Sequence, residues 1–323
     1  MRTAGAVLLG IIVLAACAAP WLAPNSPSTR FADLLYAPPT RIHVGDDVGR
    51  PHLHPLRIVN RLERRFEEDR ATHIPLRWFR DGVLVSAAPD SGVPLLLLGA
   101  DAYGRDRFSR LLYGSQATLA LGALATLLAT TIGAIVGGIA GYAGGRVDAL
   151  LSRVSEFIVV LPAIYVTLAL RAVMPLVLPG PTIFALLLAI FALLGWPMVA
   201  RGVRAIVLVE REREYAVAAR AAGASGARLL TRHLLPAAGG YLSTQASLLL
   251  PAFILAESTM SYVGLGFPDT TPTWGTMLQD ASNVSLLGDA PWALAPAAAI
   301  FMVVLGVNLM VQSTGRAPVQ LER

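Results

Sequence analysis

The sequence predicts an all-α, polytopic membrane protein with six transmembrane helices and an extended extracytoplasmic insert. Of its 323 residues, 55% are hydrophobic and only 15% are charged, a composition too apolar for a soluble domain. Several apolar runs reach the length of about 20 residues that a helix needs to cross a bilayer. Between the first two runs lies a proline-rich stretch of mixed charge, which we expect to lie in water.

The predicted elements follow the apolar runs in order. A first transmembrane helix (residues 1–22) and the insert (23–99) precede a membrane core (100–312) and a cytoplasmic tail (313–323). The five further spans are predicted at about residues 117–139, 150–170, 182–200, 241–263 and 292–311. Small residues recur in the second span at three- and four-residue spacing, which predicts close packing against another helix.

Two residues within the spans are candidates for a gate or for the transport pathway. Pro162 falls in the middle of the third span, where a proline bends a helix and frees a backbone carbonyl. A packing kink is the alternative. Glu257 lies within the fifth span, and an acid at membrane depth is a functional hypothesis by default. Interfacial solvation is the alternative for this residue.

Charge fixes the expected orientation. The net charge of +5 comes entirely from arginine, because the sequence contains no lysine. Seven arginines lie in residues 201–236, which places this loop in the cytoplasm by the positive-inside rule. Both termini are then cytoplasmic, and the insert lies outside.

The insert offers weaker signals. Residues 58–70 repeat apolar side chains every four positions among charges, which predicts an amphipathic helix, and residues 78–85 predict a hairpin around Asp81 and Gly82. The histidines of the insert lack a predicted scaffold, a cysteine or a regular spacing, so we interpret them as loop residues and predict no metal site. These are His43, His52, His54 and His73.

A single cysteine, Cys17, excludes an internal disulfide framework. It ends the run Leu14-Ala15-Ala16-Cys17, which also resembles a lipoprotein-type signal cleavage site. An acylated Cys17 is therefore an alternative to an intact first span.

The sequence pattern of the loop at residues 201–236 predicts two short helices joined by a break. The first turn of the first helix is expected to contain Glu210, Glu212 and Glu214. Negative charge is favourable at this end of a helix. Gly223 supplies a flexible stop, and Ser225 is expected to cap the second helix. Pro236 is expected to end that helix. Alanines between these signals give the first helix a smooth, thin surface against which a partner's groove can close.

This loop resembles the cytoplasmic EAA loop of the ABC importer permeases. The matching residues are Glu214, Tyr215, Ala218, Ala219, Gly223, Ala224, Ser225, Leu235 and Pro236. In that family the loop is a coupling helix that docks into a cleft on the ATPase subunit, so the resemblance implies ATPase coupling for these residues. Val217 stands where the family usually has a glutamate, and one charged anchor is absent.

Two further segments resemble the dipeptide, oligopeptide and nickel branch of that family, as a C-type subunit. One includes Gly99, Asp101, Arg105 and Arg110, and the other is Pro272-Thr273-Trp274-Gly275. The resemblance marks Trp274 and Gly275 as candidate contacts for a binding protein, against the alternative of an interfacial aromatic belt. It also reaches Glu257 and Ser261: the glutamate would brace the outer gate or the loop beyond it, and Ser261 is a further candidate for the gate or the pathway.

The resemblance implies a type I ABC importer permease fold in the inner (plasma) membrane. The partners would be a second homologous permease subunit, two ABC ATPase subunits, an extracytoplasmic substrate-binding protein and membrane lipid, with no nucleic acid. ATP and Mg²⁺ would be used by the ATPase subunits, and this chain would bind no cofactor. It would not be an enzyme, and a phosphate-binding loop of the Walker type is impossible without lysine.

Two other functions remain open at this point. An ion-coupled secondary transporter acting alone would need paired ionisable groups near the midplane of the membrane. A membrane-anchored receptor built around the insert would not need the loop at 201–236. The substrate of an importer could be a dipeptide, an oligopeptide, nickel or another small solute.

Overall fold

The computed structural model describes residues 2–44, 50–60, 63–80, 82–88, 91–172, 178–282 and 284–311. The predicted tail at residues 313–323 lies outside them. The chain divides into two compact units. One contains Ala120–Met260 with Met1–Arg2 and Val307–Arg323, and the other contains Thr3–Leu119 and Ser261–Gly306.

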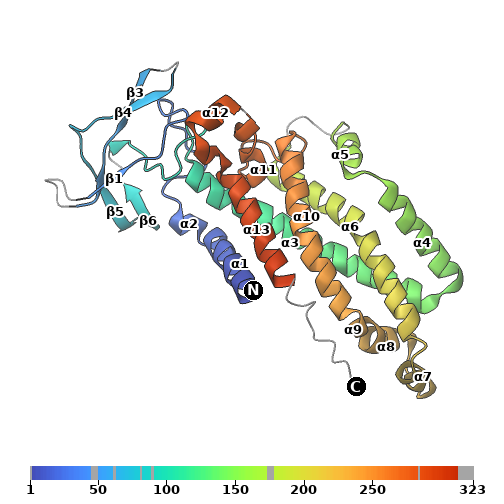
Figure 1. Cartoon of the computed structure of the whole chain (residues 1–323). Coiled ribbons are helices and arrows are strands. Elements are labelled where there is room, and N and C mark those ends of the chain that lie inside the picture. Colours follow the sequence, from blue (N-terminus) through green and yellow to red (C-terminus); the bar gives the residue numbers. More distant parts are fainter. Residues whose placement is uncertain are drawn as a thin grey trace, which may run out of the picture. The chain divides into compact units, whose positions relative to one another are not determined.

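Long apolar helices confirm a helical, polytopic membrane protein (Figure 1). Within the described residues, four helices are long and apolar enough to cross a bilayer: α3 (Arg107–Ala143), α6 (Gly180–Glu210), α10 (Gly239–Tyr262) and the stretch Pro291–Val311, which comprises η4 (Pro291–Leu294) and α13 (Ala295–Val311). The N-terminal run forms a shorter apolar helix, α1 (Arg2–Cys17), followed by α2 (Ala19–Leu22).

The predicted third span is divided into two helices. α4 (Gly145–Val160) ends before Pro162, and α5 (Ala163–Ala172) begins after it. The prediction of a continuous, bent helix was therefore wrong. Leu161 has extended dihedral angles (φ −76°, ψ 112°), as expected for a residue whose α conformation is hindered by a following proline.

The predicted close packing of the second span occurs within the chain, between α3 and α6. A Cβ atom added at Gly137 would overlap the carbonyl oxygen of Ala200, and one added at Gly133 would lie 2.5 Å from the Cβ of Val199. Because both glycines lack a side chain, the two backbones approach more closely than larger residues would permit.

The insert is built from short strands. A four-stranded sheet has the order β1-β2-β5-β6, and β3 pairs with β4. The strands are β1 (Ile42–His43), β2 (His52–Leu53), β3 (Leu56–Asn60), β4 (Arg65–Glu68), β5 (Ile74–Arg80) and β6 (Val83–Ala87). Leu53, Ile74 and Leu95 are at most 4% exposed and form the centre of its small core.

The predicted helix at residues 58–70 was wrong, because these residues belong largely to the β3–β4 hairpin. Ile58 pairs with Phe66, and Arg57 pairs with Glu67. A repeat of four fits the two-residue period of a strand as well as the period of a helix. The β-branched pair Ile58-Val59 favours the strand.

The predicted hairpin at 78–85 is confirmed as β5–β6. Trp78 pairs with Val85, and Arg80 pairs with Val83. Asp81, which was expected at the turn, lies outside the described residues. Between α10 and α13, the residues that the structure describes form short helices: α11 (Trp274–Met277), η3 (Asp280–Ser282) and α12 (Val284–Asp289) lead to η4.

Candidate coupling site

The segment between α6 and α10 contains the predicted pair of short helices. α7 (Glu214–Ala221) is followed by α8 (Gly226–Leu229), the π-helical turn η2 (Leu230–Leu234) and α9 (Leu235–Ala237). In Figure 1, α7, α8 and α9 lie around the C-terminal end of α6. α6 continues ten residues beyond the predicted end of its span at 200, so Arg201 and Arg204 belong to a helix.

Two details of the predicted segment were wrong. Glu214 alone of the three glutamates lies in the first turn of α7, because Glu210 is the last residue of α6. Pro236 does not end a helix but occupies the first turn of α9. Leu230, Leu234 and Leu235 have right-handed helical dihedral angles, so α8, η2 and α9 are continuous and the proline directly follows the π-helical turn.

Gly223 ends α7 with a Schellman motif. Its backbone has φ +86°, a left-handed conformation that costs a residue with a side chain roughly 1–2 kcal/mol. The N–H of Ala224 donates to the carbonyl of Ala219 at 3.0 Å, and the N–H of Gly223 donates to the carbonyl of Arg220 at 3.0 Å. These two bonds define the motif and satisfy carbonyls that the helix end would leave unpaired.

Ser225 caps α8 as predicted. Its hydroxyl accepts a hydrogen bond from the backbone N–H of Arg228 at 3.4 Å. The stop at Gly223 and the cap at Ser225 therefore fix the turn between the two helices from both sides.

A buried apolar face holds the segment on α6. Its members are fully buried and pack together: Val199, Val203 and Val207 of α6 with Ala216, Leu229, Leu234 and Ala238. Complete burial of a leucine side chain contributes roughly 1.5–3 kcal/mol, so Leu229 and Leu234 are the main apolar anchors. α7 contributes the small Ala216 and, partly buried, Ala219, and the helix therefore lies close against its neighbours.

The outer face of α7 has mostly small, uncharged side chains between two exposed charged residues, Glu214 and Arg220. Glu214, Ala218 and Ala221 are exposed, and Tyr215 and Val217 are 42% and 50% exposed. Val217, at the position where the family usually has glutamate, faces outward and makes this surface less charged. Such a face is complementary to a groove that is lined by apolar side chains.

Polar contacts connect the same segment to two other helices. Arg211 donates from Nη1 to the carbonyls of Gly141 at 2.9 Å and Tyr142 at 3.3 Å, at the C-terminal end of α3. Arg204 of α6 donates from Nη2 to the carboxylate of Asp148 in α4 at 2.6 Å. The hydrogen bond from Arg204 lowers the pKa of Asp148, with burial acting in the opposite direction.

Tyr215 connects α7 back to the end of α6. Its hydroxyl donates to the Glu210 carboxylate at 2.7 Å. Partial burial and this hydrogen bond raise the pKa of Tyr215 above its ordinary value. The phenol is therefore a neutral donor at physiological pH.

A buried ion-pair network in the other unit was not anticipated. Asp101 Oδ2 lies 2.7 Å from Arg105 Nε and 3.5 Å from Arg110 Nε. Asp269 contacts Arg105 Nη1 at 2.8 Å and Arg110 Nη2 at 3.3 Å. The side chains of Asp101, Arg105 and Arg110 are 2–4% exposed.

A third buried arginine strengthens the same connection. Arg107 Nη2 lies 2.7 Å from Asp280 Oδ2, and Arg107 Nε donates to the carbonyl of Ala100 at 3.0 Å. The sequence marked this segment only by its resemblance to the permease family and predicted no ion pairs in it. The signal available in the sequence was the high density of charged residues at the start of the apolar helix α3. Charged side chains need partners when they are buried, so this density could have indicated ion pairs.

The gate candidates have different surroundings. Pro162 is exposed at the break between α4 and α5. Glu257 of α10 is fully buried, and the hydroxyl of Ser258 lies 3.5 Å from its carboxylate. Ser261 holds the following loop: its hydroxyl accepts from the N–H of Phe267 at 3.1 Å, and its carbonyl accepts from Gln279 Nε2 at 2.9 Å.

The two candidate contacts for a binding protein are buried. The indole of Trp274 is 1% exposed and donates from Nε1 to the carbonyl of Leu111 at 3.2 Å. Its backbone N–H donates to Thr118 Oγ1 at 3.2 Å. Gly275 is buried beside it. The indole anchors the loop to α3, and its burial argues against direct contact with another protein.

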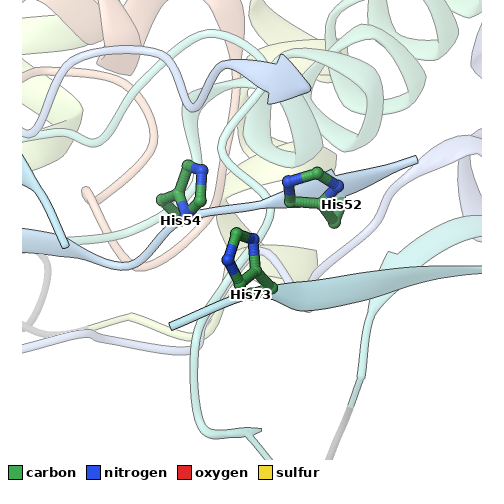
Figure 2. A group of neighbouring side chains, drawn as sticks. All are labelled: His52, His54 and His73. Carbon is green, nitrogen blue, oxygen red and sulfur yellow. The ribbon is translucent and has the colours of Figure 1, made fainter. Parts of the chain in front are cut away.

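The histidines of the insert are brought together rather than scattered in loops. His43 and His52 pair across strands β1 and β2, and the rings of His52, His54 and His73 are grouped in Figure 2. The pairing of β2 with β5 supplies the scaffold that the sequence did not reveal.

The structure combines long apolar helices with a short helical segment, α7 to α9, that is anchored on α6 and exposes small side chains on α7. Together these features define a membrane-spanning transport subunit. Residues 115–315 match the family model described as binding-protein-dependent transport system inner membrane component. Residues 1–39 match the N-terminal transmembrane domain of oligopeptide transport permease C. The chain belongs to the family of binding-protein-dependent transport system inner membrane components, the multi-pass inner-membrane permease subunits of ABC importers.

Curated relatives agree with this family. The chain is 36% identical over 212 residues to the dipeptide transport system permease protein DppC of Bacillus subtilis (strain 168), which covers 66% of this chain and 64% of the relative. It is 31% identical over 307 residues to a putative peptide transport system permease protein of Brucella suis biovar 1 (strain 1330), covering 95% and 83%. It is 30% identical over 307 residues to the di/tripeptide transport system permease protein DppC of Pseudomonas aeruginosa (strain UCBPP-PA14), with the same coverage.

Membership of the family excludes a catalytic role for this chain. ABC importer permeases form the membrane part of the transporter, and separate ATPase subunits hydrolyse ATP. An importer of this class also includes a further permease and a binding protein. Neither a secondary transporter acting alone nor a receptor is favoured.

Proposed function

We propose that this chain forms the translocation pathway of a peptide importer together with a second, homologous permease subunit, and that α7 couples the pathway to an ATPase subunit. The observation that carries the proposal is the outer face of α7. Its small side chains are exposed, while the segment behind it is anchored by fully buried residues on α6.

The anchoring explains how a movement of α7 would reach the membrane helices. Displacement of α7 relative to α6 is opposed by Ala216 and Leu229, which pack against α6. Arg211 connects the same segment to the end of α3. Because helices and packed cores deform little, displacement of α7 is expected to move α6 and α3 rather than to be absorbed locally. The cycle would shift the chain between inward- and outward-open states.

The partners follow from the class of transporter. Two ABC ATPase subunits would supply the cleft for α7 and would hold ATP and Mg²⁺, while this chain would not bind the nucleotide. An extracytoplasmic substrate-binding protein would deliver the substrate. The relatives are named for dipeptide, di/tripeptide and peptide transport, and these names support a short peptide as the substrate.

We assign α7 to the cytoplasmic side, together with both termini, and the insert to the outer side. Arginines are concentrated in residues 201–236, which supports this orientation. Pro162, Glu257 and Ser261 are assigned to gating elements. The complete burial of the Glu257 carboxylate within α10 supports this role for the glutamate.

Substitutions at the exposed Ala218 test the coupling role. Ala218→Trp adds a large side chain to the outer face of α7 without entering the core, and Ala218→Ser is the matched control of small volume. The tryptophan variant should lose the ATPase subunits on co-purification and should lose ATP-driven peptide uptake in proteoliposomes, whereas the serine variant should keep both. Full assembly and uptake by Ala218→Trp would refute docking at this face.

The single cysteine provides a test of orientation. In a Cys17→Ser background, a cysteine introduced at the exposed Ala221 should react with a membrane-impermeant maleimide only from the cytoplasmic side. A cysteine at Val59, which is 58% exposed in the insert, should react only from the opposite side. The reverse pattern would overturn the proposed orientation.

A further inference from the structure

Three imidazoles of the insert surround one point. Each of His52, His54 and His73 offers a ring nitrogen, and these nitrogens all lie within 4.8 Å of one another. The ring centroids of His52 and His54 are each 4.9 Å from that of His73, and are 5.2 Å from each other. Figure 2 shows the rings between the segment that carries His52 and His54 and the beginning of the strand after His73.

Backbone carbonyls select the tautomer of two of these rings. Nδ1 of His52 lies 3.0 Å from the carbonyl oxygen of Arg50, and Nδ1 of His54 lies 2.9 Å from that of Thr72. A carbonyl only accepts, so Nδ1 carries the proton in both neutral rings and the lone pair resides on Nε2. An N–H donated to a carbonyl is the usual outer contact of a histidine that ligates a metal through its other nitrogen.

The sheet holds the three residues in place. His52 pairs with Pro75, and Leu53 pairs with Ile74, which directly follows His73. Leu53 and Ile74 are 0% and 4% exposed, so the strands that carry the rings are anchored in the core of the insert. Ligands fixed in this way lose little freedom when they bind an ion.

Burial gives the cluster an enclosed side and an open side. His52 and His54 are 0% and 4% exposed, whereas His73 is exposed. An ion could therefore reach the two buried rings from the side of His73. The ring of His43 lies 4.8 Å from that of His54, tilted by 58°, and its Nε2 lies 3.4 Å from a carboxylate oxygen of Glu68. His43 therefore lies beside the two buried rings, with Glu68 next to it.

We propose that His52, His54 and His73 form a binding site for a divalent first-row transition metal ion of the zinc class. Neutral imidazoles suit zinc, copper and nickel, and a site for magnesium or calcium would need oxygen ligands. Three histidines leave a fourth coordination position for water. Nitrogens at 2.0–2.1 Å from a tetrahedral ion lie about 3.4 Å apart, so the rings need to rotate inward by about an ångström on binding.

The ion would connect β2 to the chain that enters β5. β1 and β2 contain only two residues each, and strands of this length gain little from their own hydrogen bonds. A ligand that binds only the folded state stabilises it, and the gain grows with the logarithm of its free concentration relative to its dissociation constant. Metal binding at this site therefore stabilises the sheet of the insert, and this role does not depend on the proposed transport function.

Titration of the full-length chain with Co²⁺ tests the proposal. The protein is purified through a tag without histidine and treated with a chelator, and Co²⁺ is followed by its visible absorption before displacement with Zn²⁺. The wild type should bind one equivalent and should unfold at a higher temperature with Zn²⁺ than without. Removing one ligand should weaken binding by about 100-fold or more, judging from losses of 10–100-fold for outer contacts.

Three variants make the result decisive. His73→Gln changes an exposed side chain and should preserve the fold while it abolishes both the cobalt spectrum and the zinc-dependent rise in unfolding temperature. His54→Gln should do the same at a buried position. His233→Gln changes the one histidine that lies outside the insert and should bind Co²⁺ as the wild type does. Less than one equivalent in the wild type, or unchanged affinity in His73→Gln, would overturn the proposal.

Discussion

Replacing Asp101 with asparagine should destabilise the connection between the start of α3 and the loop after α10. The amide oxygen can still accept from the N–H groups of Tyr103 and Arg105, which lie 2.8 and 2.9 Å from Oδ1. The amide NH₂ then faces Arg105, which donates from Nε to Oδ2 in the wild type, and Arg110, whose Nε forms an ion pair with Oδ2 at 3.5 Å. Two donors cannot bond each other, and the cluster gains one uncompensated positive charge.

The magnitude follows from the burial of this cluster. The side chains of Arg105 and Arg110 are 4% and 2% exposed, and removing one partner of a buried pair costs about 3–5 kcal/mol. Asp269 still pairs with both arginines and is 34% exposed, so we expect the lower end, about 3 kcal/mol. At about 2–4 °C per kcal/mol, the unfolding temperature should fall by about 6–12 °C.

Thermal unfolding of the purified chain in detergent provides the assay. Asp289→Asn removes one negative charge at an exposed position and serves as the control, with an expected change below about 0.5 kcal/mol. Limited proteolysis should also cut residues 262–290 faster in Asp101→Asn. Equal unfolding temperatures for the two variants would refute the argument that the buried network holds this loop.

Three further predictions concern the unit that contains the coupling segment. Gly223→Ala should cost roughly 1–2 kcal/mol locally and reduce peptide uptake, whereas Gly239→Ala, in a helix with open space around it, should leave uptake in proteoliposomes unchanged. Asp148→Asn should lower the unfolding temperature at neutral pH. Since Arg204 lowers the pKa of Asp148 from 3.8, the difference from wild type should persist down to that pH and vanish as pH falls through the folded-state pKa; a pH-independent difference would contradict this. Gly137→Val should force α3 away from α6 and cost about 1–3 kcal/mol or more, measured by unfolding temperature.

Local signals in the sequence identified most of the coupling segment. Gly223 and Ser225 act through the backbone of their immediate neighbours, and the structure confirms a helix stop at one and a helix cap at the other. Pro236 was misread because the position of a proline within a helix depends on where that helix begins. The start of α9 follows a π-helical turn that no local pattern indicated.

The periodicity of residues 58–70 led to a wrong prediction, because the same spacing of apolar residues fits both a helix and a strand. Ile58 and Phe66 fit a helical stripe, but they pair across β3 and β4. The choice between a helix and a hairpin depends on which neighbours bury these side chains. Similarly, nothing in the local sequence predicted the partner of Arg105, because Asp269 lies more than 160 residues away in sequence.

The sequence by itself determined that the chain is a helical membrane protein with a coupling-type loop, because hydropathy, helix stops and caps act over short distances along the chain. Only the tertiary structure decided which charges are buried together, that Trp274 points inward, and that three histidines separated by up to 21 residues surround one point. Those properties depend on strand pairing and on contacts between distant segments, which local spacing does not encode.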